Sequence, residues 1–366
     1  MVSTQVCMRY ALLVLVACLA LAITAVSQNV NTRFRIEQGT GAITRTGNMG
    51  GSCEDIDMDL DAVYREAIDM ARVAVAAMDG YTSDATVRAS LFTFFGIQED
   101  ESTHTVSAGS AARFSRVKAN LQEVIDDSQR QFSGLFPSLF CSEKWRWRTR
   151  YFHNRQTGKP TGQLLKSVNP DIEWLTWSPR FREYGPATVM CQGDTMAFTT
   201  SQDRKLSITL CPRYFSYPRR KDTLQPWRSG QRTIAAGTNM AVALSSPATF
   251  LHELMHMTTR SNGVTKKAYG PVLTGYLAQV EGGQKTVTNA DNYGWFATAM
   301  YLNGVDWSRI IAGKRISGPL TRRSVLLEDG HGSWRTFLRG KAGNETIDTD
   351  GMDMDGDDCS TSPWDE

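Results

Sequence analysis

The chain has 366 residues, 41% of them hydrophobic and 10% aromatic, a composition typical of globular rather than disordered proteins. Its 40 lysines and arginines nearly balance 38 aspartates and glutamates, so no overall field attracts it to nucleic acid or to an anionic membrane. Its length is sufficient for one large domain or two modest ones with a substantial core.

The N-terminus has the pattern of a secretory signal peptide. Arg9 precedes an apolar run that ends at Ala25, and Ala25 and Ser27 form a small-residue cleavage site. The run is shorter than the roughly 20 residues that a membrane-spanning helix requires. We therefore expect residues 1–27 to be removed, giving a secreted, extracellular protein that is not attached to a membrane.

The cysteines indicate disulfide bonds. Two of the seven, Cys7 and Cys18, would leave with the signal peptide, and an odd number remains. In an oxidising compartment most of these should pair. Cys191 and Cys211 flank two strand-like runs and are the first candidates for a bridge. Asn344 begins an N-glycosylation sequon in a polar segment where a glycan would be tolerated.

The N-terminal part of the chain is predicted to be helical. A polar segment at 28–53 precedes a helix over Asp55–Met78, whose apolar residues recur at steps of three and four. A second helix is expected near 84–96 and a third over Ala111–Phe132. Their apolar faces are expected to form core.

The middle of the chain is rich in aromatic and β-branched residues and is predicted to form strands. The clearest are Ala187–Cys191, Thr195–Thr199 and Leu206–Cys211. Within it, Lys144–Phe152 alternates basic and aromatic residues. On a strand this pattern puts rings on one face and cations on the other, and we favour rings in the core over a surface for nucleic acid. A basic loop is expected at 212–232, with Arg219, Arg220 and Lys221 solvated.

Helices are expected to return from Ser246 to about Tyr301, and the chain ends in an acidic tail at 346–366. The tail lacks the full ligand pattern of an EF-hand in every register, so it is not expected to bind calcium. The predicted organisation is one domain over 54–345, its helical N-terminal part at about 54–135.

The most informative segment surrounds His252, Glu253 and His256. Ser246 is a suitable N-cap and Pro247 suits the first turn, so a helix begins just before the motif. Histidines four apart lie on one helix face, and both imidazoles can therefore reach one metal ion. Zn²⁺ is the ion this pair predicts, because neutral imidazole is a good zinc ligand. Glu253 is offset around the helix, where it can act as general base towards a water molecule.

A third ligand is needed, and it must be sought further along the chain. Thr259 and Asn262 stand where metzincins carry glycine and histidine, which excludes that class. The first carboxylates after the motif are Glu281 and Asp291.

Four segments, in order, resemble the deuterolysin or aspzincin family, in particular fungal secreted peptidyl-lysine metalloendopeptidase-like proteins. They are Ser207–Phe215, His252–His256, Tyr269–Gly270 and Asn289–Ala297. The resemblance covers about 185–305. It implies an α+β, zincin-like fold that is mainly helical, with a small mixed sheet and a cleft beside the motif helix.

The resemblance also implies roles for individual residues. Tyr269 would donate a hydrogen bond to the substrate or the transition state. The family's third zinc ligand is an aspartate, and Lys266 stands at that position here. Asp291 corresponds to a cleft residue that holds a cationic substrate side chain in lysine-specific members. It is also a candidate zinc ligand, a helix-dipole partner, or an ion-pair partner of Lys266.

Two functional hypotheses follow. The first is a secreted zinc metalloendopeptidase, acting as a monomer on protein or peptide substrates and not on nucleic acid. The second, for which Lys266 is the motive, is a pseudoprotease that acts as an extracellular binding protein.

Overall fold

The structure is a computed structural model that describes residues 29–36, 53, 56–130, 136–178, 181–185, 188–202, 205–259, 268–280, 283–311, 324–328 and 334–338. The signal-peptide segment, Asn344 and the acidic tail lie outside these residues. Among the described residues, no helix combines the length and hydrophobicity that crossing a bilayer requires.

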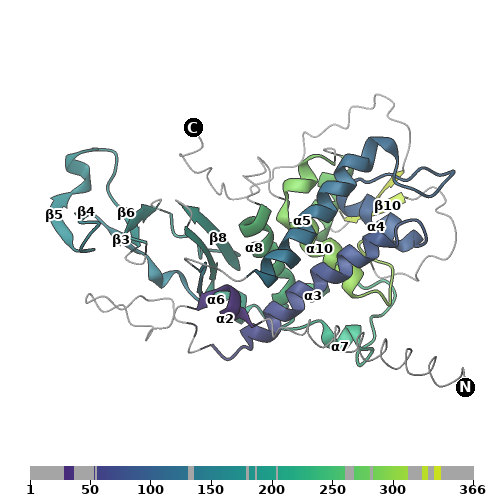
Figure 1. Cartoon of the computed structure of the whole chain (residues 1–366), viewed down its shortest axis with the longest axis horizontal. Coiled ribbons are helices and arrows are strands. Elements are labelled where there is room, and N and C mark those ends of the chain that lie inside the picture. Colours follow the sequence, from purple (N-terminus) through teal and green to yellow (C-terminus); the bar gives the residue numbers. More distant parts are fainter. Residues whose placement is uncertain are drawn as a thin grey trace, which may run out of the picture.

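The described part combines helices with several small sheets (Figure 1). The helices are α2 (Val30–Arg33), α3 (Leu60–Asp79), α4 (Ala85–Phe95), α5 (Ala111–Gln129), α6 (Pro212–Ser216), α7 (Gln225–Arg228), α8 (Ser246–Thr259), α9 (Gly270–Gln279) and α10 (Ala290–Tyr301). The strands are β1 (Arg35–Ile36), β2 (Ser138–Phe140), β3 (Trp147–Thr149), β4 (Tyr151–His153), β5 (Pro160–Leu164), β6 (Leu175–Ser178), β7 (Glu183–Gly185), β8 (Ala197–Gln202), β9 (Lys205–Leu210), β10 (Ser324–Glu328) and β11 (Trp334–Leu338).

Helices α3, α5, α8 and α10 form the body of the molecule, with α4 and α9 packed beside them (Figure 1). The predicted apolar face of α3 is buried. The helix begins at Leu60 rather than Asp55 because the Asp59 carboxylate accepts the Ala62 N–H at 2.8 Å and caps it. Helix α4 ends at Gly96, whose φ of +62° is the left-handed conformation that glycine adopts without a Cβ clash.

Buried rings join the N-terminal segment to the motif helix. Phe34, Tyr64 and Phe250 meet edge to face, with ring centroids 5.9–6.1 Å apart. All three are essentially inaccessible to solvent. Such pairs contribute about 0.5–1.5 kcal/mol each beyond the area they bury, so α8 is firmly seated in the core.

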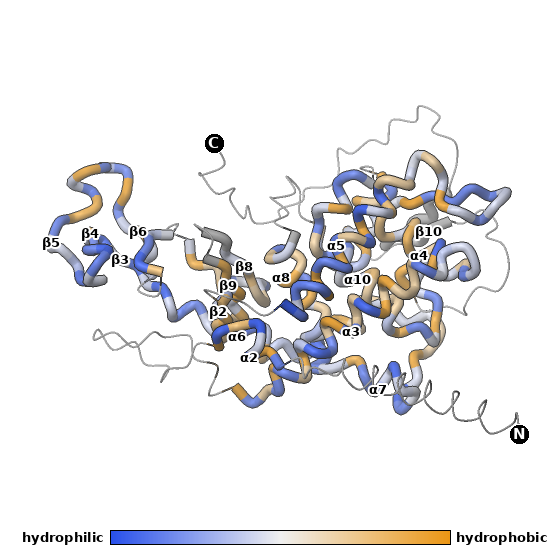
Figure 2. The backbone as a smooth tube through the Cα atoms, viewed as in Figure 1, coloured by the Kyte–Doolittle hydropathy of each residue, from blue (hydrophilic) through white to orange (hydrophobic). Residues whose placement is uncertain are grey.

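The main sheet has the order β1-β2-β9-β8. Strands β1, β2 and β9 are parallel, and β8 is antiparallel to β9, so the sheet is mixed. Strand β8 is an outer strand of this sheet and lies beside α8 (Figure 1). Figure 2 shows hydrophobic residues along β2 and β9.

Two disulfides brace this sheet. Cys191 and Cys211, the pair expected from the sequence, are bonded across the β8–β9 hairpin. Cys53 and Cys141 join the segment before α3 to the end of β2, across 88 residues. In the chain-entropy model, closing a loop of that length stabilises the fold by about 4–5 kcal/mol.

Three sequence predictions differ from the structure. Described residues 188–191 are irregular rather than the predicted strand, and the chain bends at 190–191, where Cys191 is bonded to Cys211. The expected loop at 212–232 contains α6 and α7. Arg220 is 7% exposed rather than solvated, since it stacks on the ring of Tyr214.

Candidate active site

Buried side chains hold the start of the motif helix α8. The Ser245 hydroxyl accepts a hydrogen bond from the Ala248 N–H at 3.2 Å, so Ser245 is the cap and Ser246 the first helical residue. The Ser246 carbonyl accepts the Tyr214 hydroxyl at 3.0 Å. Burial raises the pKa of Tyr214, and this hydroxyl therefore remains a donor. The Arg220 guanidinium also donates to the Ser246 hydroxyl.

His252 and His256 point their Nε2 atoms at each other across one turn of α8, 3.1 Å apart. Two imidazole nitrogens bound tetrahedrally to one zinc ion at about 2.05 Å would be about 3.3 Å apart. The same spacing suits an N–H···N hydrogen bond in the metal-free protein. The two rings are therefore arranged as two arms of one metal site.

Asp291, in the first turn of α10, contacts the opposite edge of the His252 ring. Its Oδ1 lies 2.9 Å from Nδ1 of His252. Its Oδ2 accepts the Gly270 N–H at 2.6 Å and the indole N–H of Trp295 at 3.0 Å. The carboxylate thus favours the His252 tautomer with the proton on Nδ1, in which Nε2 can act as an acceptor or a ligand. In this position it faces away from the edge that would bind metal.

Glu253 is 3% exposed and is fixed by a strand residue. Its Oε2 lies 2.7 Å from the hydroxyl of Thr199, which is also 3.1 Å from the Glu253 carbonyl oxygen. Thr199 belongs to β8, so the outer strand of the sheet holds the carboxylate of the motif helix.

Tyr269 lies beside the histidines, just before α9. Its ring is nearly parallel to that of His252, with centroids 6.0 Å apart and an interplanar angle of 19°. The side chain is 54% exposed. It therefore covers one side of His252 and has access to molecules arriving from solvent.

The structure thus gathers His252, Glu253, His256, Tyr269 and Asp291 from α8, the start of α9 and α10. Among the described residues, no group of three or more histidine, cysteine, aspartate or glutamate side chains is arranged to hold a metal ion. The two imidazoles of His252 and His256 converge, and the Asp291 carboxylate contacts Nδ1 of His252 rather than the point on which they converge.

Lys266 and Glu281, the other residues that bear on the third ligand, lie outside the described residues.

Sequence patterns did not single out Thr199, Trp295 or Ser245. Thr199 is 54 residues from Glu253 along the chain, and a threonine in a strand carries no signal of such a contact. Trp295 follows Asp291 by four residues on α10, so their helical spacing could have suggested the pair.

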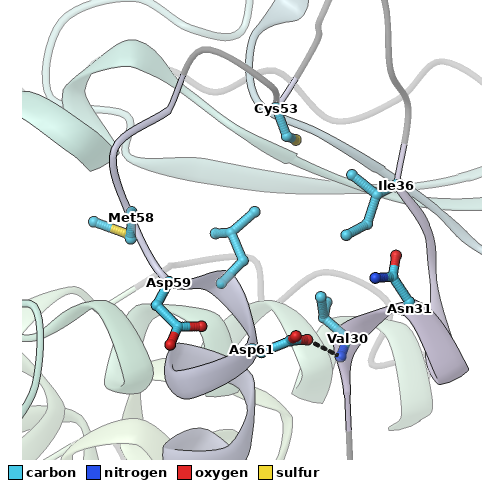
Figure 3. Close-up of a pocket in the computed structure, with 8 residues that line it drawn as sticks. Val30, Asn31, Ile36, Cys53, Met58, Asp59 and Asp61 are labelled. Atoms are coloured by element: carbon cyan, nitrogen blue, oxygen red, sulfur yellow. Dashed lines mark hydrogen bonds between the residues drawn. The ribbon is translucent and has the colours of Figure 1, made fainter.

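A pocket of about 260 Å³ lies elsewhere, between α2, β1 and the start of α3 (Figure 3). It is lined by Val30, Asn31, Ile36, Cys53, Met58, Asp59, Leu60 and Asp61. Its two carboxylates are already used, since Asp59 caps α3 and Asp61 accepts the Val30 N–H at 2.7 Å. None of the predicted site residues lines it.

No family model and no curated protein sequence matches the chain. Among solved structures, it is similar to a zinc peptidase from Grifola frondosa, with 16% sequence identity and a TM-score of 0.32. That comparison covers 65% of this chain and 93% of the other.

Proposed function

We propose that this protein is a secreted zinc-dependent metalloendopeptidase whose centre is His252, Glu253 and His256. The observation that carries the proposal is the 3.1 Å distance between the Nε2 atoms of His252 and His256. The buried Glu253 follows His252 on the same helix. Two imidazoles that converge on one point, one of them oriented from behind by a carboxylate, are arranged as metal-binding histidines usually are.

His252 and His256 would hold zinc through Nε2. When bound, zinc supplies Lewis acidity to the scissile carbonyl and to the attacking water. Asp291 acts as the orienting partner of His252, since its hydrogen bond keeps the proton on Nδ1. In this role Asp291 does not bind the metal directly. Glu281 is then the candidate for the third zinc ligand.

Glu253 serves as the general base. Thr199 holds the carboxylate through Oε2, and the carboxylate would accept a proton from the attacking water and deliver it to the leaving amine. Tyr269, exposed beside His252, donates a hydrogen bond to the developing oxyanion.

Strand β8 supplies a surface for the substrate. It is an outer strand of the main sheet, and its residue Thr199 contacts the catalytic glutamate. An extended peptide can add to such an edge through backbone hydrogen bonds, which favours unfolded or loop segments of proteins as substrates. The two disulfides support secretion, because such bonds persist in oxidising compartments.

The alternative is a pseudoprotease with the same fold that binds extracellular proteins without cleaving them. Lys266 at the family's aspartate position motivates it. A site with only two zinc ligands would bind the metal weakly.

Zinc content and hydrolysis of an unfolded protein substrate separate the two. We expect about one zinc per chain in the native protein, and loss of zinc in His252→Ala. Glu253→Gln should retain zinc while its hydrolysis rate falls by about 10²–10⁴-fold. Absence of zinc from the native protein, even with excess metal, would favour the pseudoprotease.

A further inference from the structure

The described residues 143–178 and 181–185 form an arm that leaves the main sheet after β2 and returns before β8 (Figure 1). It contains two small sheets, β3-β6-β7 and β4-β5. Trp177 is fully buried, stacked on His153 with centroids 4.5 Å apart and tilted against Tyr184 at 4.9 Å. The arm therefore has a small core of its own and presents a defined surface.

The base of the arm is fixed to the strands beside the candidate active site. The indole N–H of Trp145 donates to the Thr209 hydroxyl of β9 at 3.0 Å. The guanidinium of Arg146 lies 5.2 Å from the ring centroid of Phe198 in β8. Phe198 immediately precedes Thr199, so the arm is continuous with the strand that contacts Glu253.

The surface of the arm is strongly basic. Between residues 148 and 185 the exposed cations among the described residues are Arg148, Arg150, Arg155, Lys159, Lys166 and Arg182. The exposed carboxylates over the same residues are Asp171 and Glu173. The whole chain is nearly neutral, at +2, whereas the exposed surface of this arm carries a clear excess of positive charge.

Several of these cations are held in place without being neutralised. Arg148 lies over the ring of Trp174, 3.7 Å from its centroid, and keeps its full charge. Arg182 donates to the backbone carbonyl of Gln156. Of these six exposed cations, Arg150 alone forms an ion pair with a described residue, with Glu173 at 2.7 Å. Fixed, unneutralised cations bind an anionic partner with less loss of side-chain entropy.

We propose that the arm is a docking site for an acidic, extended polypeptide segment of the substrate, an inference that rests on the proposed peptidase function. Such a segment would bind the cations of the arm while the chain beyond it continues along β8 to Glu253. The rings are poorly placed for single-stranded nucleic acid, which needs exposed aromatic faces. Trp145 and Trp177 are buried, Trp174 is covered by Arg148, and Tyr151 is the large aromatic side chain left exposed within the described part of the arm.

The test is direct binding of a fluorescent peptide of alternating aspartate and glutamate to the full-length protein, followed by anisotropy. The variant Arg155→Gln/Lys159→Gln/Lys166→Gln removes three cations that make no ion pair within the described residues. We expect about a tenfold loss of affinity from the removal of three exposed charge contacts. Binding should also weaken as salt is raised.

A matched control removes three exposed cations from the body. Arg65→Gln/Arg116→Gln/Arg232→Gln changes the net charge equally and should leave the affinity within about twofold. Equal losses in the two triple variants would mean that only net charge matters and would overturn the proposal. Tighter binding of a single-stranded oligonucleotide, lost in the arm variant, would also overturn it.

Hydrolysis then distinguishes this inference from the proposed function. Two peptides share one cleavage sequence, and one of them carries an acidic extension. The arm variant should lower kcat/KM about tenfold for the extended peptide alone. If neither peptide is cleaved but binding depends on the arm, the docking site stands and the peptidase fails. Cleavage without any preference for the extension would refute the docking site and leave the peptidase intact.

Discussion

Replacing Asp291 by asparagine should weaken zinc binding while leaving the fold largely intact. The carboxylate receives three hydrogen bonds, from His252 Nδ1 at 2.9 Å, Gly270 N–H at 2.6 Å and Trp295 Nε1–H at 3.0 Å. An amide has only one oxygen, so it cannot accept on both sides. If the oxygen faces Gly270 and Trp295, the amide N–H₂ forces His252 to carry its proton on Nε2, which blocks the metal.

The opposite flip places the amide N–H₂ against two other donors, the backbone N–H of Gly270 and the indole N–H of Trp295. Each donor without an acceptor costs about 1–3 kcal/mol, so this flip would cost about 2–6 kcal/mol, and the first flip, which satisfies both donors, is favoured. Loss of an outer hydrogen bond to a ligand histidine lowers metal affinity by about 10–100-fold. Asp291→Asn should therefore bind zinc that much more weakly than the native protein.

Zinc affinity can be measured by competition with a chromophoric chelator, and stability by urea unfolding of the metal-free protein. Asp194→Asn is the matched control, because Asp194 is an exposed carboxylate whose ion-pair partner among the described residues is the half-buried Arg213. It should leave both quantities unchanged. A folded Asp291→Asn protein with zinc affinity within twofold of native would refute the orienting role of Asp291.

Three further predictions follow from contacts elsewhere. Thr199→Val should lower kcat about tenfold or more with little change in KM or zinc content, because it removes the hydroxyl that holds Glu253. Thr199→Ser keeps this hydroxyl and should retain most of the native kcat. Unchanged kcat in the valine variant would contradict the positioning role. Burial raises the pKa of Glu66 above its ordinary 4.5, so the folded state binds this proton more tightly and stability falls as pH rises from 4.5 through the folded value. Glu66→Gln should flatten that decline, as measured by urea unfolding at several pH values, and an unchanged slope would refute it. Gly96→Ala should lower the free energy of unfolding by about 2 kcal/mol or more, since a Cβ at φ +62° would lie 2.7 Å from a backbone carbonyl of α9, while Gly109→Ala, which meets nothing within 4 Å, should be neutral.

Local patterns anticipated much of the helical body. The apolar faces at steps of three and four correspond to α3, α4 and α5, because burial of one face is what stabilises a helix in a protein. Boundaries were less predictable, as the start of α3 shows. Its position depends on the cap formed by Asp59, and several nearby acidic residues could have served.

The basic and aromatic run at 144–152 shows where the pattern was insufficient. Trp145 is buried as expected for a ring on the core side, but Arg146 is buried beside it instead of facing solvent. Its guanidinium stacks on Trp145 and pairs with Glu143, which satisfies the charge. An alternating pattern predicts which side chains are buried only if every cation lies in solvent. Arg146 can be buried because the carboxylate of Glu143 compensates its charge.

The sequence by itself determined the chemistry that is available. Histidines four apart with a glutamate between them on a helix can face one ion, whatever surrounds them, because helical geometry is local. The disulfide between Cys191 and Cys211 is likewise a short-range feature, since it joins the segment before β8 to the residue that follows β9.

Only the tertiary structure decided how that chemistry is oriented. Asp291 reaches His252 across 39 residues, and Thr199 reaches Glu253 across 54. Such contacts depend on how α10 and β8 pack against α8, and that packing is set by the whole core. Nothing in the spacing of residues along the chain encodes which edge of an imidazole a distant carboxylate will meet.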